Sequence, residues 1–246
     1  MMYIKPGIFE SDNQIVAGFS TRLGGVSTGP YDSLNLGLST QDRREDVLAN
    51  RQLLFEEVGF GTDALAITGQ VHGTDLIVVD QPGLYKGYDA IVTEKPGILL
   101  CLSAADCASV LIADAQNRII GACHAGWRGT VGGIISNTVN AMLERGAQVA
   151  ALKAYVSPCI SGDNFEVGPE VADQFDAAFI RSIPGKDKPH VDLKKAIHAQ
   201  LLEQGISVAA IEISTHCTFA ETHQFYSHRA EKGKTGRHMG FIGLIA

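Results

Sequence analysis

The chain has 246 residues, of which 45% are hydrophobic and 19% charged, and its formal net charge is −7. This composition is typical of a globular protein large enough to bury a substantial core. The negative charge and the lack of a long basic run argue against a nucleic-acid partner. No apolar run reaches the roughly 18–20 residues that a membrane-spanning helix needs, so no membrane partner is expected.

The first half of the chain predicts an irregular segment, one helix and a series of short strands. The first residues, MMYIKPGIFESDNQ, lack the features of a signal peptide. Residues 18–37 are rich in Gly, Ser, Thr and Asn and favour a long loop. A helix is expected over about 42–58, where apolar residues recur at helical spacing after an acidic start. Apolar runs then predict strands, joined as hairpins rather than βαβ units, over 65–71, 75–80, 89–93, 97–103, 108–114 and 118–124.

The second half predicts more helix. Residues 129–145 place their apolar side chains on one face, with Gly146 as a plausible C-cap. Mixed strands and segregated helices imply an α+β fold, with a mixed sheet covered by helices. No linker divides the chain, so a single domain over 1–246 is expected. The remaining predicted elements are strands over 152–158, 207–214 and 238–245 and helices over about 168–181 and 191–204.

Three strand ends carry residues that can bind a metal. The run RIIGACH ends at His124, and glycines and a new helix follow, a junction suited to ligand binding. His72 ends the strand in GQVHGTD, and Cys107 lies at the mouth of the strand in LSAADCASVLI. Two neutral imidazoles and a thiolate make a good zinc site with a fourth position open for water or substrate. We predict that these three residues converge, although their spacing matches no local metal motif.

The other cysteines are predicted to be structural. Cys123 precedes His124 on a strand, so its side chain points to the opposite face. Cys101 and Cys159 have no polar neighbours and are expected in the core. Five cysteines without a CxxC pair indicate reduced thiols, hence a cytoplasmic protein. Cys217 lies among His216, His223 and His228, which could form a second metal site. The favoured interpretation is that these histidines belong to a solvated surface loop.

Two polar segments are candidates for anion binding. The loop over 18–37 can cradle a phosphate, with Arg22 neutralising it, or it can be an ordinary surface loop. The stretch GKTG at 233–236 lacks the strand and the first glycine of a P-loop, so a nucleoside triphosphate site is rejected. Arg237, directly after it, can still supply a positive charge.

The chain resembles the bacterial laccase-domain family, whose members are also described as zinc-dependent purine nucleoside phosphorylases. In that family two histidines and one cysteine hold the metal, which implies His72, Cys107 and His124 as metal ligands and as the catalytic residues here. The family fold is similar to a cysteine-dependent deamidase domain of a bacterial toxin. The resemblance spans nearly the whole chain and is carried, in order, by GFSTRLGGVSTGPYDSLNLG, QVHG, DAIVT, ADC, HAGWRG, FEVG and a terminal TGR.

The resemblance implies phosphorolysis of adenosine, inosine and methylthioadenosine to the base and ribose 1-phosphate, and hydrolytic deamination of adenosine. The implied cofactor is Zn²⁺, with Cu²⁺ as a second metal that such a site binds. The implied partners are purine nucleosides and phosphate; the oligomeric state is left open. The candidates for holding phosphate or sugar are Arg22 first, then Arg237, Arg128, Ser33 and Asn35.

Two departures from the family pattern bear on substrate preference. Ala104 and Ala105 stand before Asp106, where relatives usually have Thr and Ala, and this removes a hydroxyl group. Arg229 is followed by Ala230, where a second Arg is common. Neither change touches a predicted ligand.

Three other functions compete with the phosphorylase. In a metal-free hydrolase or amidase, acting on peptidoglycan precursors, Cys107 would be the nucleophile and His124 its base. A copper polyphenol oxidase is less favoured, because the eight histidines include no His-x-His pair. A purine-binding module without turnover is the least favoured.

Overall fold

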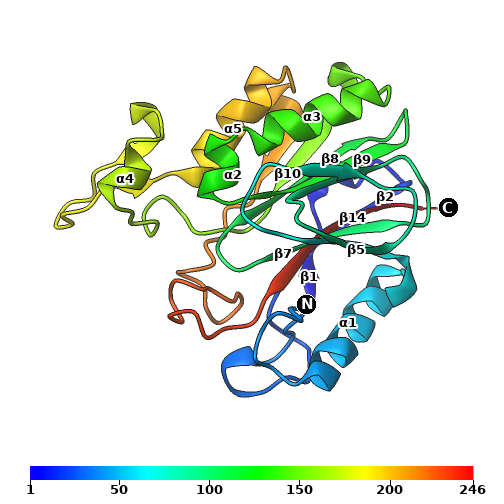
Figure 1. Ribbon diagram of the computed structural model, residues 1–246, viewed down its shortest axis with the longest axis horizontal. Helices are drawn as coiled ribbons and strands as arrows, with labels where there is room; N and C mark the ends of the chain where they lie inside the picture. Colours follow the sequence, from blue (N-terminus) through cyan, green and yellow to red (C-terminus); the bar gives the residue numbers. More distant parts are fainter. Residues whose placement is uncertain (246) are drawn as a thin grey trace.

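Two six-stranded sheets pack face to face in the computed structural model, which describes residues 1–245 (Figure 1). Residue 246, the end of the predicted domain, lies outside this description. Helices α2, α3 and α5 cover the outer face of one sheet, and α1 covers the outer face of the other (Figure 1). The α+β prediction with mixed sheets under helices is therefore confirmed. The helices are α1 (Arg44–Val58), α2 (Trp127–Val131), α3 (Ile134–Glu144), α4 (Pro169–Ala172) and α5 (Leu193–Glu203).

Both sheets are mixed. The first contains, in spatial order, β1 (Tyr3–Ile4), β2 (Ile15–Ser20), β14 (His238–Leu244), β7 (Leu99–Ala104), β3 (Leu65–Gly69) and β5 (Gly83–Lys86). The second contains β13 (Ile211–Ile213), β10 (Lys153–Val156), β8 (Ala108–Asp114), β9 (Ile119–Ala125), β6 (Ala90–Thr93) and β4 (Leu76–Val78). A small third sheet pairs β11 (Ile180–Arg181) with β12 (His190–Val191).

The predicted series of hairpins is wrong except for β8 and β9, which form an antiparallel pair. From β3 to β8 the chain alternates between the two sheets, so strands that follow each other in sequence never pair. As a result β3 runs parallel to both β5 and β7, and β4 runs parallel to β6. Turn residues mark where a strand ends, but they do not specify which sheet the next strand joins.

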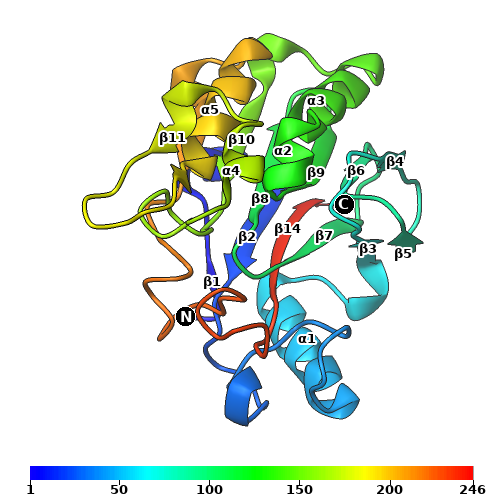
Figure 2. The ribbon, with the colours of Figure 1, turned by 60° about the vertical axis from the view of Figure 1, so that its left-hand side comes forward.

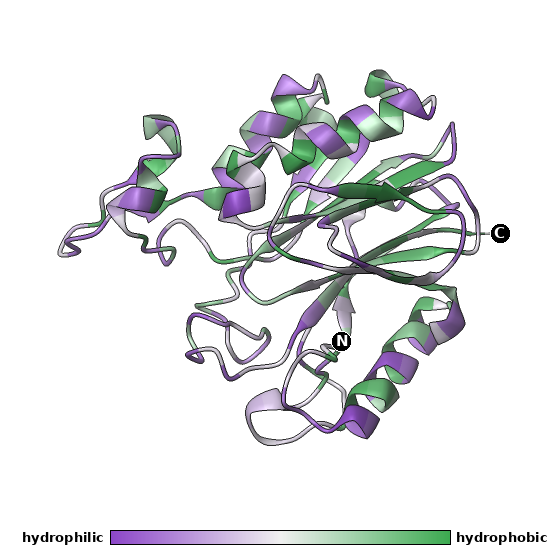
Figure 3. Ribbon diagram, viewed as in Figure 1, coloured by the Kyte–Doolittle hydropathy of each residue, from purple (hydrophilic) through white to green (hydrophobic). Residues whose placement is uncertain are grey.

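The core has three layers, and alternate residues of a strand face different layers. On β9, Ile120 and Ala122 face the first sheet, whereas Ile119 and Cys123 pack beneath the helices. Every residue of β8, β9 and β14 is buried. This burial on both faces explains why the central strands are almost continuously apolar (Figure 3).

The predicted helix over 129–145 consists of two helices. Gly132 and Gly133 separate α2 from α3, and Gly133 has a φ of +85°, a left-handed conformation that glycine adopts without strain. The C-cap of α3 is Arg145, and Gly146, which was predicted as the C-cap, follows it. Gly146 has a φ of +99°. None of the helices within residues 1–245 has the length and apolar character needed to cross a bilayer.

Other boundaries differ more. The helix expected over 168–181 is wrong beyond α4, because the Asp176 side chain accepts a hydrogen bond from the Ala178 N–H and caps a new 3-10 turn. The helix over 191–204 is confirmed by α5, whose N-cap Asp192 accepts from the Lys195 N–H. The strand expected over 207–214 is limited to β13 and is half-buried. Strand β2 enters the segment expected to be irregular, and β1 and β5 were not predicted.

Candidate metal centre

His72, Cys107 and His124 meet at one end of the gap between the two sheets. Their ligand atoms all lie within 4.8 Å of one another, so the predicted convergence is confirmed. His72 follows β3, Cys107 lies in the turn from β7 to β8, and His124 lies near the end of β9. His72 is exposed, Cys107 half-buried and His124 buried, so the cluster opens to solvent on the His72 side. No other cluster of three or more such ligands occurs in the described chain.

Cys123 and His124 are neighbours on β9, and their side chains point to opposite faces of the sheet, as predicted. His124 shares the inter-sheet face of Ala122, whereas Cys123 packs in the cluster beneath the helices. Burial raises the pKa of the Cys123 thiol to about 12, so this cysteine stays protonated and inert. Cys101 and Cys159 are buried as expected.

Asp89 contacts two of the three candidate ligands, and the sequence analysis did not assign it. Its fully buried carboxylate accepts the His124 Nδ1–H at 2.9 Å, which leaves Nε2 as the nitrogen free for a metal. It also accepts the backbone N–H groups of Val71, His72 and Gly73 at 3.0, 3.1 and 2.8 Å. One carboxylate therefore positions two of the three ligands. The sequence feature that could have identified Asp89 is the run DAIVT, which carries part of the family resemblance and begins at this residue.

The backbone is strained at two points of the centre. His72 and Asp106 have φ values of +61° and +90°, in the left-handed region that non-glycine residues rarely adopt. The Asp106 carboxylate is anchored by the Thr218 hydroxyl and the Arg229 backbone N–H, both at 2.7 Å. Figure 2 shows the segment between β13 and β14, from orange to red, near the turn that joins β7 to β8. These contacts hold Asp106, and with it the adjacent Cys107, in the turn between β7 and β8.

The electrostatics favour a charged pair in the metal-free protein. Burial opposes a thiolate, but the His124 and His72 imidazoles outweigh it and lower the pKa of Cys107 to about 6. Burial likewise opposes an imidazolium, but Cys107 and Asp89 raise the pKa of His124 to about 9. At neutral pH the centre therefore holds a thiolate beside an imidazolium, and the thiolate is ready to bind a metal.

The donor set fits a catalytic zinc ion. Two imidazole nitrogens and one thiolate provide three ligands, and the open side leaves a position for water or substrate. Gly126 closes the wall behind the sulfur, because a Cβ at this position would lie 2.9 Å from the Cys107 Sγ. A side chain at position 126 would therefore crowd the Cys107 sulfur, which explains the glycine.

The predicted phosphate residues of the early loop are engaged within the protein. Arg22 donates from Nε to the Asp32 carbonyl at 2.7 Å and forms an ion pair with Glu231 at 3.2 Å, and it stacks on Tyr226. The Ser33 hydroxyl donates to the Arg22 carbonyl at 2.9 Å.

Asn35 is fully buried, which contradicts its predicted role in contacting sugar or phosphate. Its amide nitrogen donates to Thr40 and Asp42, and its oxygen accepts from the N–H groups of Gly37 and Arg237. All its polar groups are satisfied inside the loop, so Asn35 shapes the loop and has none free for a ligand.

The other two arginines differ in their relation to the centre. Burial lowers the pKa of Arg237, while the nearby charges of Asp106 and Cys107 oppose this shift. The Arg237 guanidinium donates to the carbonyl groups of Thr235 and Gly236 at 3.1 and 2.9 Å. Arg128 is exposed on α2, with its guanidinium 4.4 Å from the ring centroid of Trp127.

A hollow of about 350 Å³ was not assigned by sequence reasoning, and two of its lining residues are linked to residues of the centre. Trp127, three residues after His124, forms one side, and Arg229, whose N–H holds Asp106, forms another. The Arg229 guanidinium lies 5.6 Å from the centroid of the Phe165 ring. The hollow thus combines two aromatic rings with the cations of Lys188 and Arg229 and the carboxylates of Glu166 and Glu170.

The predicted alternative of a surface loop fits the histidines around Cys217 better than a second metal site. His216 pairs with Glu221 at 2.7 Å, and His223 and His228 are exposed.

Comparison with known proteins identifies the family. Residues 16–245 match the family described as multi-copper polyphenol oxidoreductase laccase. The chain belongs to this family. A family member from Deinococcus radiodurans, named purine nucleoside phosphorylase, is 42% identical over 228 residues, which cover 92% of this chain and 88% of that protein. Purine nucleoside phosphorylase YlmD of Bacillus subtilis is 32% identical over 256 residues, covering 96% and 90%.

Solved structures with similar sequences share the fold. The crystal structure of YlmD from Geobacillus stearothermophilus matches with a TM-score of 0.92 and 31% identity, covering 100% of this chain and 97% of that one. A Neisseria meningitidis protein matches with a TM-score of 0.88 and 32% identity, covering both chains completely.

Proposed function

We propose that this laccase-family protein is a zinc-dependent purine nucleoside phosphorylase. Its substrates would be adenosine, inosine or methylthioadenosine with inorganic phosphate, and its products the free base and ribose 1-phosphate. The observation that carries the proposal is the open His72–Cys107–His124 cluster. The names of relatives that are 32–42% identical and span more than nine-tenths of the chain support the same activity.

His72, Cys107 and His124 would hold the zinc ion, with Asp89 fixing the His124 tautomer. A bound zinc ion supplies positive charge and lowers the pKa of a water molecule to about 7. That chemistry suits a second proposed activity, in which water attacks C6 of adenosine and ammonia leaves. Trp127 and Phe165 of the 350 Å³ hollow would offer ring faces to the purine. Arg237, which lies outside this hollow's lining, would offer positive charge to phosphate.

The first experiment measures metal content together with turnover. The purified protein is analysed for zinc and copper, then assayed with adenosine with and without phosphate, before chelation, after it, and after zinc return. Adenine and ribose 1-phosphate that require both phosphate and zinc would support phosphorolysis. Inosine formed without phosphate would support deamination. A metal-free protein with no nucleoside turnover would refute both.

A thiol hydrolase is the second candidate, because Cys107, His124 and Asp89 also form the chain expected of a nucleophile, base and orienting carboxylate. Its proposed substrates are amides of peptidoglycan precursors. His72 separates the two candidates, since a metal site needs it and a thiol nucleophile does not. His72→Ala should abolish a zinc activity, whereas a thiol activity should survive both this change and chelation.

The polyphenol oxidation in the family description is the weakest candidate. A multicopper site needs several clustered histidines, whereas residues 1–245 gather one three-ligand cluster. We further propose a cytoplasmic location, supported by the five free thiols.

A further inference from the structure

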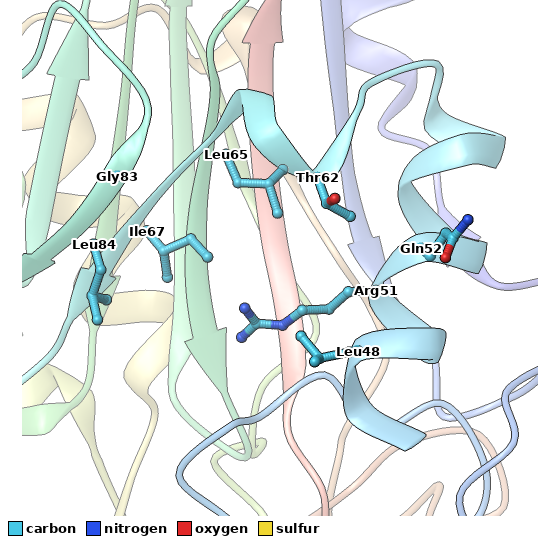
Figure 4. Close-up of a pocket in the computed structure, with 8 residues that line it drawn as sticks. All are labelled: Leu48, Arg51, Gln52, Thr62, Leu65, Ile67, Gly83 and Leu84. Atoms are coloured by element: carbon cyan, nitrogen blue, oxygen red, sulfur yellow. The ribbon is translucent and has the colours of Figure 1, made fainter. Parts of the chain in front are cut away.

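A second hollow, of about 370 Å³, lies between α1 and the edge of the first sheet (Figure 4). Leu65 and Ile67 of β3 form part of its wall, and they belong to the core layer under α1. Ala66 between them belongs to the inter-sheet layer instead. The hollow therefore lies on the outer face of the first sheet, away from the inter-sheet gap that holds the metal centre.

Arg51 dominates the chemistry of this hollow. Its side chain extends from α1 toward the strands, with the guanidinium between Leu48 and Ile67 (Figure 4). The Nε–H donates to the Leu36 carbonyl at 2.9 Å, but within residues 1–245 the two terminal nitrogens have no hydrogen-bond or ion-pair partner. Burial lowers the pKa of Arg51, Cys101 opposes this shift, and the charge of Arg44 adds to it. The cation is thus partly desolvated and lacks a counterion.

The rest of the wall that the structure describes is mostly aliphatic and includes no acidic residue. Leu84 on the edge strand β5 is 61% exposed, and Leu48 on α1 is 45% exposed. Thr62 and Gln52 add neutral polar groups. The hollow therefore combines one unpaired cation with exposed apolar side chains, which cost free energy when they face water.

We propose that this hollow binds an aliphatic monocarboxylate. The two free nitrogens of a guanidinium match the two oxygens of a carboxylate, which gives a bidentate, charge-assisted contact. The aliphatic tail would cover Leu48 and Leu84. The volume is at the lower end of the range for small-molecule sites, so a chain of medium length fits.

The test uses octanoate as the probe and the zinc-loaded full chain, followed by amide and arginine Nε–H shifts in an NMR titration. 1-Octanol supplies the tail without the charge, and acetate supplies the charge without the tail. Leu84→Asp puts an anion into the wall of the hollow that holds Arg51, at an exposed position where we expect the fold to tolerate it. Val208→Asp is the matched control, because Val208 is 65% exposed and precedes β13, at the edge of the other sheet.

We expect saturable shifts centred on Arg51, Thr62 and Leu84, with octanoate at least about tenfold tighter than either fragment. Leu84→Asp should weaken binding about tenfold or more, and Val208→Asp should leave it unchanged. Arg51→Gln should abolish binding, with its melting temperature checked because the bond to Leu36 is lost. Equal binding of octanol, full binding to Leu84→Asp, or shifts centred on the metal ligands would each overturn the proposal. The outcome is independent of nucleoside turnover.

Discussion

Replacing Asp89 by Asn should damage the metal centre more than it damages the fold. The carboxylate accepts four hydrogen bonds, from the N–H groups of Val71, His72 and Gly73 and from His124 Nδ1. An amide can accept on one atom only, so its NH₂ group must face donors. With NH₂ toward His124, the ring can change tautomer and accept that hydrogen bond. The proton then moves to Nε2, the nitrogen that the metal needs.

The magnitude follows from these contacts. In that orientation the His72 N–H loses its acceptor, which costs about 1–3 kcal/mol of stability for one buried unsatisfied donor. Zinc binding must additionally restore the original tautomer against the amide, and loss of such an orienting carboxylate lowers metal affinity about 10–100-fold. We therefore expect a zinc dissociation constant raised by one to two orders of magnitude in a protein that still folds.

Asp114→Asn is the matched control. Asp114 is also buried, and it accepts three hydrogen bonds, two from Asn117 and one from the Gln148 N–H. It ends β8, about 20 Å along the strand from Cys107. Zinc affinity is measured by competition with a chelating dye, and stability by urea unfolding. If both variants changed zinc affinity equally, or if Asp89→Asn bound zinc normally, the positioning role of Asp89 would be refuted.

The remaining predictions concern the sulfur ligand and its protons. Cys107→Ala should remove bound zinc, whereas Cys123→Ala should retain it, because Cys123 packs beneath the helices; metal analysis of both proteins would expose the reverse pattern. Gly126→Ala should lower zinc affinity about tenfold or more at an allowed φ of −77°, since the new methyl group would crowd the sulfur. Zinc must displace the proton of His124, whose pKa is raised to about 9, so affinity should fall about tenfold per pH unit below pH 9. The fall should steepen below pH 6, where Cys107, with a pKa lowered to about 6, is also protonated; an affinity independent of pH would contradict this assignment.

The sequence held enough information to place two ligands together. The hairpin of β8 and β9 pairs Ser109 with His124 and Ala108 with Ala125. Extended by one step, this register sets Cys107 opposite Gly126, with Cys107 on the same face as Ser109. Cys107 and His124 are therefore diagonal neighbours, and the glycine opposite the cysteine follows from the same pairing. Strand periodicity and one recognised turn suffice for this part of the site.

His72 could not be placed in the same way. It follows β3, a strand of the other sheet, and strands from β3 to β8 alternate between sheets without any local signal. Its position depends on a left-handed backbone and on hydrogen bonds to Asp89, which lies 17 residues away in sequence. The helix expected over 168–181 failed for a related reason, because a local cap at Asp176 outweighed the apolar pattern.

The three ligands are consequently held with unequal rigidity. His124 lies in β9 and Cys107 directly precedes β8, so the ladder of β8 and β9 sets their separation. His72 is exposed on a loop that three backbone hydrogen bonds to one carboxylate hold in place. We therefore expect the geometry of Cys107 and His124 to depend less on the loop of residues 71–73 than the position of His72 does. Asp89 also binds His124, so one carboxylate holds both this loop and the metal-binding tautomer. Metal affinity should thus follow the order of this loop, even though the loop contributes only one ligand.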